Sequence, residues 1–426
     1  MKTKQTKILF LTIALGMTLP CLAQTTQPFV VRRAEAAFEE LPVLNASDIL
    51  RPDILTGPHH KVREPVPTRF GANQFVIDSD FGVFEANGNE MLVRRINEIN
   101  AIAQLKDVSR TDQYKNALVA AAKSPVAAAK NIVTDPLNTV ANVPKGIMKF
   151  MSRAGESVKN IGKKTESSAA EGSKMQQMIG FSDAKRKVAI KLGVDPYSTN
   201  SVLQHELDGI AWASFAGGLT FQVATLPISG PALTVTGVTS TFQDVLREKS
   251  PTDLKMMNRK TLLALGAGEK ETERLLNNNA FSPSEQTAFV LNLKSLDGVA
   301  NRGAFVRTAG ETSSDESDAI FCVQTAALMS QIQKDNKPLA CITMIGDFPI
   351  CVAKDGTIIV AFQWDYAAWT SGVATFTSDV QKLAARSGKN KSALVALSGQ
   401  VSPRLRQELE NRGFVVHDRL VPGPLK

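Results

Sequence analysis

Several side chains stand at spacings that enzymes use for catalysis, yet each pattern is incomplete. His205 begins the zinc-protease pattern H-E-x-x-H, but Gly209 occupies the position of the second histidine. Ser182 and Lys185 have the S-x-x-K spacing of serine–lysine acyl transfer, but the companion K-T-G is missing. The sequence therefore contains no standard hydrolytic motif, and it favours a protein that is not an enzyme.

The densest aromatic cluster lies in residues 364–369. Aromatic rings with one acid stack on sugars or on the side chains of a partner protein, and this set comprises Trp364, Asp365, Tyr366 and Trp369. The alternative is a seam between a sheet and a helix, because we expect a helix from Asp365 onward. If the protein is a hydrolase without a standard motif, His205 and Asp208 join this cluster as the first candidates for catalysis.

No cofactor and no metal is indicated. The chain contains neither G-x-G-x-x-G nor G-K-[ST], and its cysteines and histidines lack zinc-site spacing. Asp78 and Asp80 are spaced as in a calcium loop, but Asn89 stands where that loop needs a bidentate glutamate. Cys341 and Cys351 either form a disulfide across a hairpin or are small buried residues.

Positive charge is concentrated in residues 123–164, which hold eight Lys or Arg against Asp135 and Glu156. Residues 145–163 predict an amphipathic helix with one basic and one apolar face, the kind that lies on an anionic membrane surface. An ordinary helix with a solvated charged face is the alternative. The candidate membrane contacts are Lys145, Lys149, Arg153, Lys159, Lys163 and Lys164. Nucleic acid is not an expected partner, because Phe150 is the one aromatic residue of the stretch.

Residues 209–243 contain no charged side chain and no histidine. Pro227 and Pro231 interrupt the run, so its first part is marginal for a membrane span and its second part is too short. A pair of buried helices joined by a Pro/Gly turn explains the run without lipid. Because small residues that face each other leave room, residues 202–246 are also the expected wall of a cavity for a small apolar ligand.

The N-terminus predicts export. Three lysines precede an apolar stretch, and Cys21-Leu22-Ala23 then offers small residues before a cleavage point. This is the pattern of a secretory signal peptide cut after Ala23. Lipidation of Cys21 is the alternative, but Leu19-Pro20 before it fits that reaction poorly.

The elements that position these residues divide the chain into six parts. They are a signal peptide over 1–23, an extended N-terminal arm over 24–73, a β-hairpin plus helix over 74–122, a basic amphipathic helix and linker over 123–176, a helical domain with an apolar core over 177–337, and a C-terminal α/β unit over 338–426. In the last part, apolar strands alternate with helices, and strand–helix–strand connections in one sheet are right-handed with parallel strands. We therefore predict a mixed α+β fold, whose helical middle region is followed by an α/β unit with a mixed sheet and a βαβ element.

Four stretches together resemble a family of exported bacterial proteins of unknown function: "GVDPYSTN" (193–200), "IAWASFAGG" (210–218), "DYAAWTSGVATF" (365–376) and "SGQVSPRLRQELENRGFVV" (398–416). The resemblance covers most of the chain after the signal peptide. It implies export and a shared architecture in several parts. It brings no activity, cofactor or catalytic residue.

The first hypothesis is a non-catalytic exported protein, periplasmic or associated with the cell surface, that contacts an anionic membrane surface or an envelope protein. The second is a periplasmic hydrolase without a standard motif. The third is a periplasmic carrier of a small apolar ligand.

Overall fold

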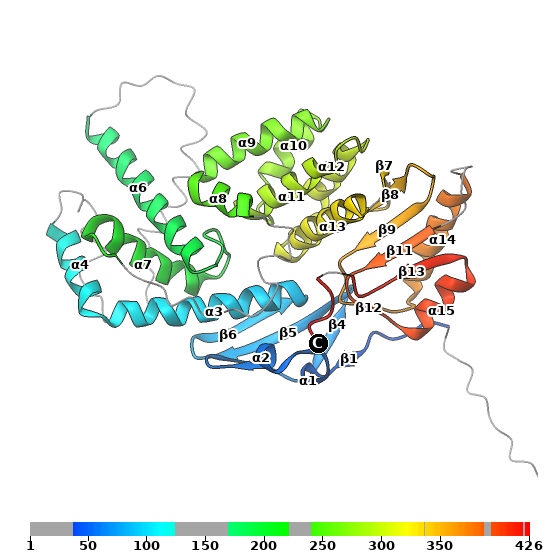
Figure 1. The fold of residues 1–426 in the computed structure, drawn as a ribbon, viewed down its shortest axis with the longest axis horizontal. Coiled ribbons are helices and arrows are strands. Elements are labelled where there is room, and N and C mark those ends of the chain that lie inside the picture. The colour runs from blue at the N-terminus through cyan, green and yellow to red at the C-terminus, as the bar shows by residue number, and fades with distance from the viewer. Residues whose placement is uncertain (1–36, 124–168, 221–239, 336, 387–392, 421) are drawn as a thin grey trace, which may run out of the picture. The chain divides into compact units, whose positions relative to one another are not determined.

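The computed structural model describes residues 37–123, 169–220, 240–335, 337–386, 393–420 and 422–426. These residues form two main β-sheets, one from the start and one from the end of the described chain, with a series of helices between them in sequence (Figure 1). The predicted α+β class is confirmed, including a C-terminal mixed sheet with parallel strand pairs.

The first sheet is antiparallel and is organised around β5 (Ala72–Ser79). Its remaining strands are β1 (Val43–Leu44), β2 (Thr56–Gly57), β3 (His60–Val62), β4 (Val66–Arg69) and β6 (Gly82–Asn87). β4 pairs with the first two residues of β5, and β3 pairs with its last three. All six residues of β6 pair with β5, from Gln74 to Ser79. Two one-turn helices, α1 (Ala46–Ile49) and α2 (Pro52–Leu55), connect the short strands.

The described part of the expected N-terminal arm belongs to this sheet. Residues 37–73 form strands and short helices whose hydrogen bonds run to β5 and to one another, so they do not form an extended arm. The predicted hairpin after β5 is present, because Ser79 pairs with Gly82.

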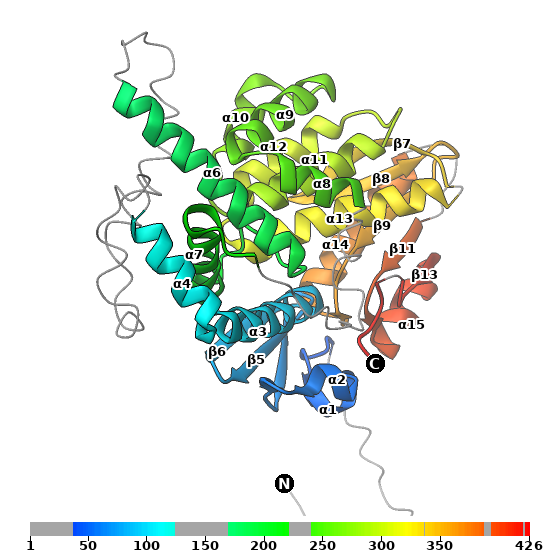
Figure 2. The ribbon, with the colours of Figure 1, turned by 60° about the vertical axis from the view of Figure 1, so that its left-hand side comes forward.

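α3 (Asn89–Arg110) joins the sheet to the next helices and matches the helix predicted from Asn89. Its first half shares a core with β5 through Leu92, Ile96 and Phe75. Its second half shares a core with α4 (Asp112–Lys123), α6 (Ala169–Lys191) and α7 (Ser201–Gly217). α7 packs against both α4 and α6 (Figure 2).

The helical middle region continues with α8 (Ser240–Glu248), α9 (Pro251–Ala264), α10 (Glu269–Leu276), α11 (Pro283–Ser295), α12 (Arg302–Thr312) and α13 (Glu316–Lys334). Local sequence signals mark the starts of two of these helices. Ser282 and Glu285 form a capping box at the start of α11, with Pro283 at the first position. Ser250 and Asp253 form the equivalent box of α9.

The second sheet has the order β13-β11-β9-β8-β7. Its strands are β7 (Leu339–Ile345), β8 (Phe348–Ala353), β9 (Ile358–Phe362), β11 (Ala393–Leu397) and β13 (Phe414–His417). β7, β8 and β9 form antiparallel hairpins, whereas β9, β11 and β13 are parallel. The crossover helices are α14 (Ser371–Arg386) and α15 (Pro403–Asn411), which makes two successive βαβ units.

Alternate residues of β9 serve two different cores, as expected for a strand buried on both faces. Ile359 and Ala361 belong to the core of the middle helices, α11 to α13 among them. Ile358, Val360 and Phe362 belong to the core shared with α14 and α15. The second sheet is therefore covered by helices on both faces (Figure 1).

The structure differs from the sequence-based predictions for several elements. The linker expected over 163–176 is helical from Ala169, because these residues form the first turns of α6. The helix expected from Asp365 begins only at Ser371, since Tyr366 and Ala367 form β10 instead. Residues 1–23 and the predicted basic helix over 145–163 lie outside the described residues.

The uncharged run over 209–243 is described in part. Its first residues complete α7, in which Ile210, Ala211 and Ala213 are fully buried as predicted for a core helix, and residues 221–239 lie outside the description. Among the described helices, none combines the length and the apolar character needed to cross a bilayer.

Cys322, Cys341 and Cys351 carry free thiols. In the β7–β8 hairpin, Cys351 is opposite Ile342, and Cys341 is opposite Val352. The one-residue offset places the two side chains on opposite faces of the hairpin, so they do not form the disulfide. The alternative of small buried residues is correct for Cys351, whereas Cys341 is partly exposed.

Candidate functional site

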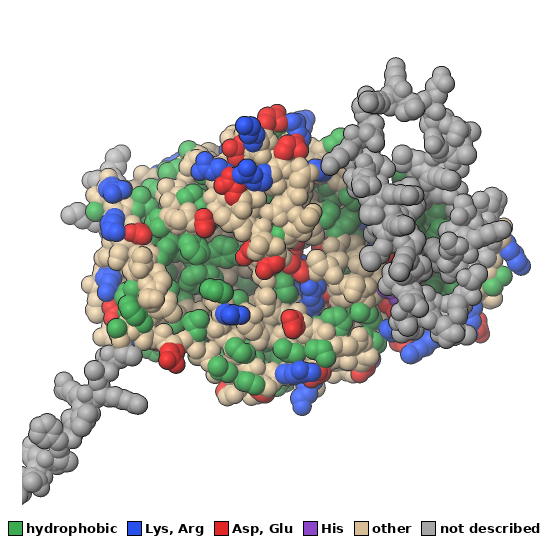
Figure 3. Space-filling view, turned by 180° about the vertical axis from the view of Figure 1, so that it is seen from behind, with side chains coloured by type: hydrophobic (Ala, Val, Ile, Leu, Met, Phe, Trp, Pro, Cys, Tyr) green, Lys and Arg blue, Asp and Glu red, His purple; other side chains and the backbone are tan. Residues whose placement is uncertain are grey.

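A cavity of about 860 Å³ lies among the described residues and is large enough to hold a small ligand. Its wall comes from the β4–β5 turn, the start of α3, α13, the end of β9 and α14. Most of the side chains in this wall are apolar. Figure 3 shows hydrophobic side chains gathered around a hollow on the face opposite to that of Figure 1.

The cavity lies beyond the carboxyl ends of two parallel strands, the usual place for a ligand in an α/β sheet. β9 ends at Phe362 and β11 ends at Leu397, and both residues line the cavity. The chain then continues as β10 (Tyr366–Ala367) and β12 (Gln400–Val401), which pair in parallel. Gly399 directly precedes β12, and Asp365 directly precedes β10. The two residues are so close that a Cβ on Gly399 would lie 2.1 Å from the carbonyl oxygen of Asp365.

Aromatic rings form one side of the cavity. They are Phe321 of α13, Phe348 of β8, Phe362 of β9, Phe376 of α14, and Trp364 from the segment that follows β9. The ring centroid of Phe348 lies 5.4 Å from those of both Phe362 and Phe376. Trp364 lies 5.3 Å from Phe362 and 6.4 Å from Phe348. Because 36 % of Phe348 is still exposed, part of this aromatic cluster faces the open cavity.

Three of the four residues predicted to contact a ligand or partner line this cavity, namely Trp364, Asp365 and Tyr366. Trp369 does not, since it is buried in the core beside α14, with the Arg412 guanidinium 4.6 Å above its ring. The structure therefore divides the predicted cluster. Trp364 belongs to the wall of the cavity, and Trp369 belongs to the seam between sheet and helix.

The Asp365 carboxylate is held by main-chain groups of the first sheet and α3. It accepts hydrogen bonds from the N–H of Asn73 at 2.9 Å and from the N–H of Asn89 at 3.1 Å. Burial raises the pKa of Asp365 to about 7, although these two hydrogen bonds oppose the shift. Asp365 therefore acts first as a link between the C-terminal unit and the start of α3.

A two-residue turn forms part of the cavity wall. Arg69 of β4 pairs with Ala72 of β5, so Phe70 and Gly71 form the loop between them. The Gly71 carbonyl accepts the N–H of Asp365 at 2.7 Å. The Trp364 ring packs directly on Gly71, where a Cβ would lie 2.5 Å from the indole. This turn is thus fixed to the strand end that carries the aromatic wall.

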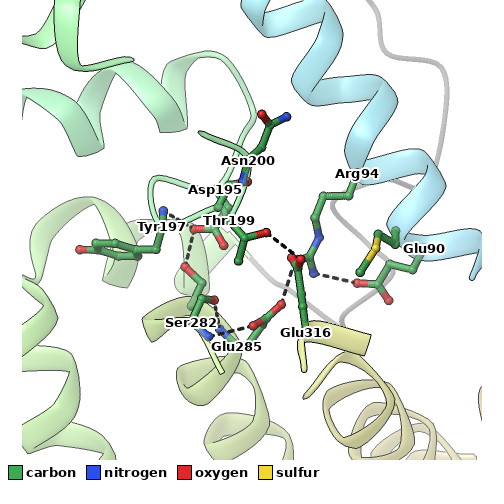
Figure 4. Close-up of polar contacts among 12 residues, drawn as sticks. Glu90, Arg94, Asp195, Tyr197, Thr199, Asn200, Ser282, Glu285 and Glu316 are labelled. Atoms are coloured by element: carbon green, nitrogen blue, oxygen red, sulfur yellow. Dashed lines mark hydrogen bonds and ion pairs between the residues drawn. The ribbon is translucent and has the colours of Figure 1, made fainter. Parts of the chain in front are cut away.

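A second polar feature lies beside the cavity (Figure 4). Two arginines and five acids meet where α3, the loop over 193–200 and the first turns of α11 and α13 come together: Glu90, Arg94, Arg95, Glu98, Asp195, Glu285 and Glu316. Arg94 donates to Glu285 at 2.9 Å and to Glu316 at 3.4 Å. Arg95 donates to Glu98 and to Glu316, both at 2.8 Å.

The acids of this cluster have partners. Asp195 accepts from the Ser284 hydroxyl at 2.6 Å, and burial raises its pKa to about 6. Glu90 accepts from Arg94 and from the Gln324 amide, and burial raises its pKa as well. A cavity of only about 90 Å³ adjoins the cluster. The arrangement joins four segments of the chain and leaves no space for a ligand larger than a few waters.

The residues suspected for hydrolysis do not come together. Asp208 pairs with Lys185 of α6 at 2.6 Å, and His205 is exposed on α7. Neither residue lines the large cavity, whereas Trp364 does, so they do not meet the aromatic cluster there. Of the segment predicted to form an apolar cavity, 202–246, the described residues 202–220 and 240–246 contribute nothing to its wall either. The candidate membrane contacts Lys145, Lys149, Arg153, Lys159, Lys163 and Lys164 lie outside the described residues.

Sequence reasoning missed most of the cavity wall. Phe348, Phe362 and Phe376 are ordinary core residues by pattern, and only the fold brings them together. A local signal existed for Phe70, because a two-residue turn between β-rich runs favours Asn-Gly and this chain has Phe-Gly. Comparison of the chain with protein families, curated proteins and solved structures found no match.

Proposed function

We propose that this protein binds a small, largely apolar molecule in the 860 Å³ cavity and does not transform it chemically. The observation that carries the proposal is the cavity itself, with its aromatic wall at the carboxyl ends of β9 and β11. Its volume is within the range of about 300–1,000 Å³ that is usual for small-molecule sites. The carrier hypothesis is thus kept, but its site moves from 202–246 to the C-terminal unit.

Polar groups of the wall suit the orientation of a ligand. Gln363 and Tyr366 line the cavity, and their side chains make no hydrogen bond to other described residues. An amide and a phenol there can donate to or accept from one polar end of an otherwise apolar molecule. The aromatic rings on the other side supply a large apolar contact area.

The acids of the cavity favour binding over hydrolysis. Asp365 is engaged by the main-chain N–H groups of Asn73 and Asn89. Glu90 is engaged by Arg94 and Gln324. Asp315 and Asp318 also line the cavity, and they accept main-chain N–H groups of Ser317 and Ser314. A general acid or base must exchange its proton with a substrate, and these contacts engage all four carboxylates.

Two measurements test the proposal. Native mass spectrometry of the protein from the envelope fraction, before and after organic extraction, should reveal the mass loss of a small apolar molecule. Titration with the neutral apolar dye 1-N-phenylnaphthylamine should give saturable fluorescence that Val373→Trp reduces, because Val373 lines the cavity. Val83→Trp is the matched control, since Val83 is 56 % exposed on β6 and outside the wall. Equal binding by both variants, or none by the parent protein, would refute the proposal.

Export and contact with an anionic surface form a second proposal, which rests on the signal-peptide pattern and on the charge of residues 123–164. The protein would then be periplasmic or associated with the cell surface. Replacement of Lys145, Lys149, Arg153 and Lys159 by Glu should abolish sedimentation with vesicles that contain phosphatidylglycerol. Unchanged sedimentation, or none of the parent protein, would contradict it.

A further inference from the structure

Phe70 occupies a backbone conformation that a bulky side chain rarely adopts. Its φ is +49°, and Gly71 after it has a φ of +83°. Two successive positive φ angles in a two-residue hairpin loop define a turn that prefers Asn-Gly. Among the described residues, the other non-glycine residues with positive φ are Asn301 and Arg419. Strain of this kind concentrates at ligand sites, because there it is maintained for function.

The Phe70 side chain is also exposed to an unusual degree. Its exposed fraction is 86 %, the highest among the large hydrophobic residues of the described chain. The ring contributes little to the core, and the Arg69 guanidinium lies 5.9 Å from the ring centroid. Neither packing nor backbone preference therefore explains a phenylalanine here.

The position of the turn does explain it. Gly71 is fixed by the Asp365 N–H and by the Trp364 ring, so the turn cannot relax away from the C-terminal unit. Phe70 therefore stands at the mouth of the cavity and lines it together with Leu41, which is 37 % exposed. An apolar molecule that fills the cavity would meet the aromatic wall on one side and the Phe70 ring at the opening.

We propose that Phe70 is a ligand-contact residue, whose ring covers the apolar molecule at the mouth of the cavity. This inference rests on the proposed function and adds the residue that holds the ligand in place. The ligand is then an apolar or aromatic molecule that extends from the Phe348 cluster to the mouth. When the Phe70 ring covers the ligand, the ring is removed from water. This hydrophobic contact offsets the free-energy cost of the exposed ring and strained turn in the protein without ligand.

The test uses variants that separate backbone strain from ring contact. Phe70→Asn suits the turn and removes the ring, so it should raise Tm by about 1–3 °C while weakening 1-N-phenylnaphthylamine binding about tenfold. Phe70→Ala keeps the unfavourable φ and should weaken binding without a gain in Tm. Phe70→Tyr keeps the ring and should bind within about twofold of the parent protein.

The outcomes distinguish this inference from the proposed function. If the parent protein binds the dye and Phe70→Asn binds it equally well, Phe70 is not a ligand contact, although the cavity remains a binding site. If Phe70→Asn lowers Tm, the ring supports the fold and the inference is likewise wrong. If the parent protein binds no dye at all, the proposed function fails and this inference fails with it.

Discussion

The Asp365 carboxylate accepts the main-chain N–H of Asn89, the first residue of α3, across a sequence separation of 276 residues. Gly88 precedes Asn89 at the cap position and has no side chain that could accept this N–H. Asp365 therefore supplies the helix cap from another part of the chain. The same carboxylate accepts the N–H of Asn73, so one side chain joins the first sheet, α3 and the C-terminal unit.

This contact predicts a pH effect on stability. Burial raises the pKa of Asp365 from 3.8 to about 7. Because the folded protein binds this proton more tightly than the unfolded chain, the group stabilises the fold fully below the pKa of the unfolded state. The contribution falls as pH rises from about 4 and is lost above 7. Asp365→Asn cannot titrate, so the free energy of unfolding of the parent protein should fall relative to this variant by on the order of 3 kcal/mol between pH 4 and pH 8.

Urea unfolding of both proteins across this pH range measures the difference. Glu90 and Asp195 also have raised pKa values, but both are present in the parent protein and in the variant, so their effects largely cancel. Parallel pH profiles would contradict the prediction. Asp365→Ala removes the cap altogether and should lower stability at every pH, by about 1 kcal/mol or more.

A second prediction concerns the close approach of two chain segments under the cavity. A Cβ on Gly399 would lie 2.1 Å from the Asp365 carbonyl oxygen, so Gly399→Ala forces the loops after β9 and β11 apart. We expect a loss of about 3 kcal/mol or more, because backbone on both sides must move. Gly372→Ala in α14 is the control, since its nearest neighbour is 3.9 Å away and alanine favours a helix. Thermal unfolding of the two variants compares them, and an equal Tm would refute the steric explanation.

Locally encoded features of the fold could be predicted from the sequence. The hairpin after Ser79 is correct because it depends on residues that are neighbours in the chain. The parallel strands β9, β11 and β13 followed from the lengths and order of their apolar runs.

Features that depend on distant partners could not be predicted. β1 and β2 are two residues long and exist as strands through pairing with β4 and β3. The helix expected from Asp365 starts later, because the N–H groups of Asp365 and Tyr366 donate to Gly71. The cavity was missed for the same reason, since its wall joins segments as far apart in the chain as Leu41 and Gly423, and each segment reads as ordinary core by itself.

The third prediction is a difference in thiol reactivity. Burial raises the pKa of Cys322 to about 12 and that of Cys351 further still, and both side chains are buried. Cys341 is partly exposed and should be the one thiol of the three that a neutral disulfide reagent modifies in the folded protein. In a chain whose Cys21 is replaced by Ser, the further substitution Cys341→Ser should abolish this reaction, with Cys322 and Cys351 reacting after unfolding in urea. Rapid modification of the Cys341→Ser protein would contradict the structure.

The fourth prediction tests the cluster of arginines and acids. Arg94 bonds Glu285, whose side chain is 4 % exposed, and also contacts Glu316. Arg94→Met leaves Glu285 without its counter-charge in a buried place, whereas Glu316 keeps Arg95 at 2.8 Å. Removal of one partner of a buried pair costs about 3–5 kcal/mol. Arg110→Met on the same helix is the control, because Arg110 is 78 % exposed and its pair with Asp107 is a surface pair.

The double variant Arg94→Met/Glu285→Gln decides whether buried charge is the cause. If the loss comes from an uncompensated carboxylate, neutralising Glu285 should recover a clear part of it, since the cost of a buried unpaired charge disappears. If the loss comes from the packing of the arginine side chain, the second substitution should add to the damage. Urea unfolding of the single and double variants measures the coupling. Strictly additive losses would mean that the cluster joins α3, α11 and α13 through side-chain packing, with no net contribution from its charges.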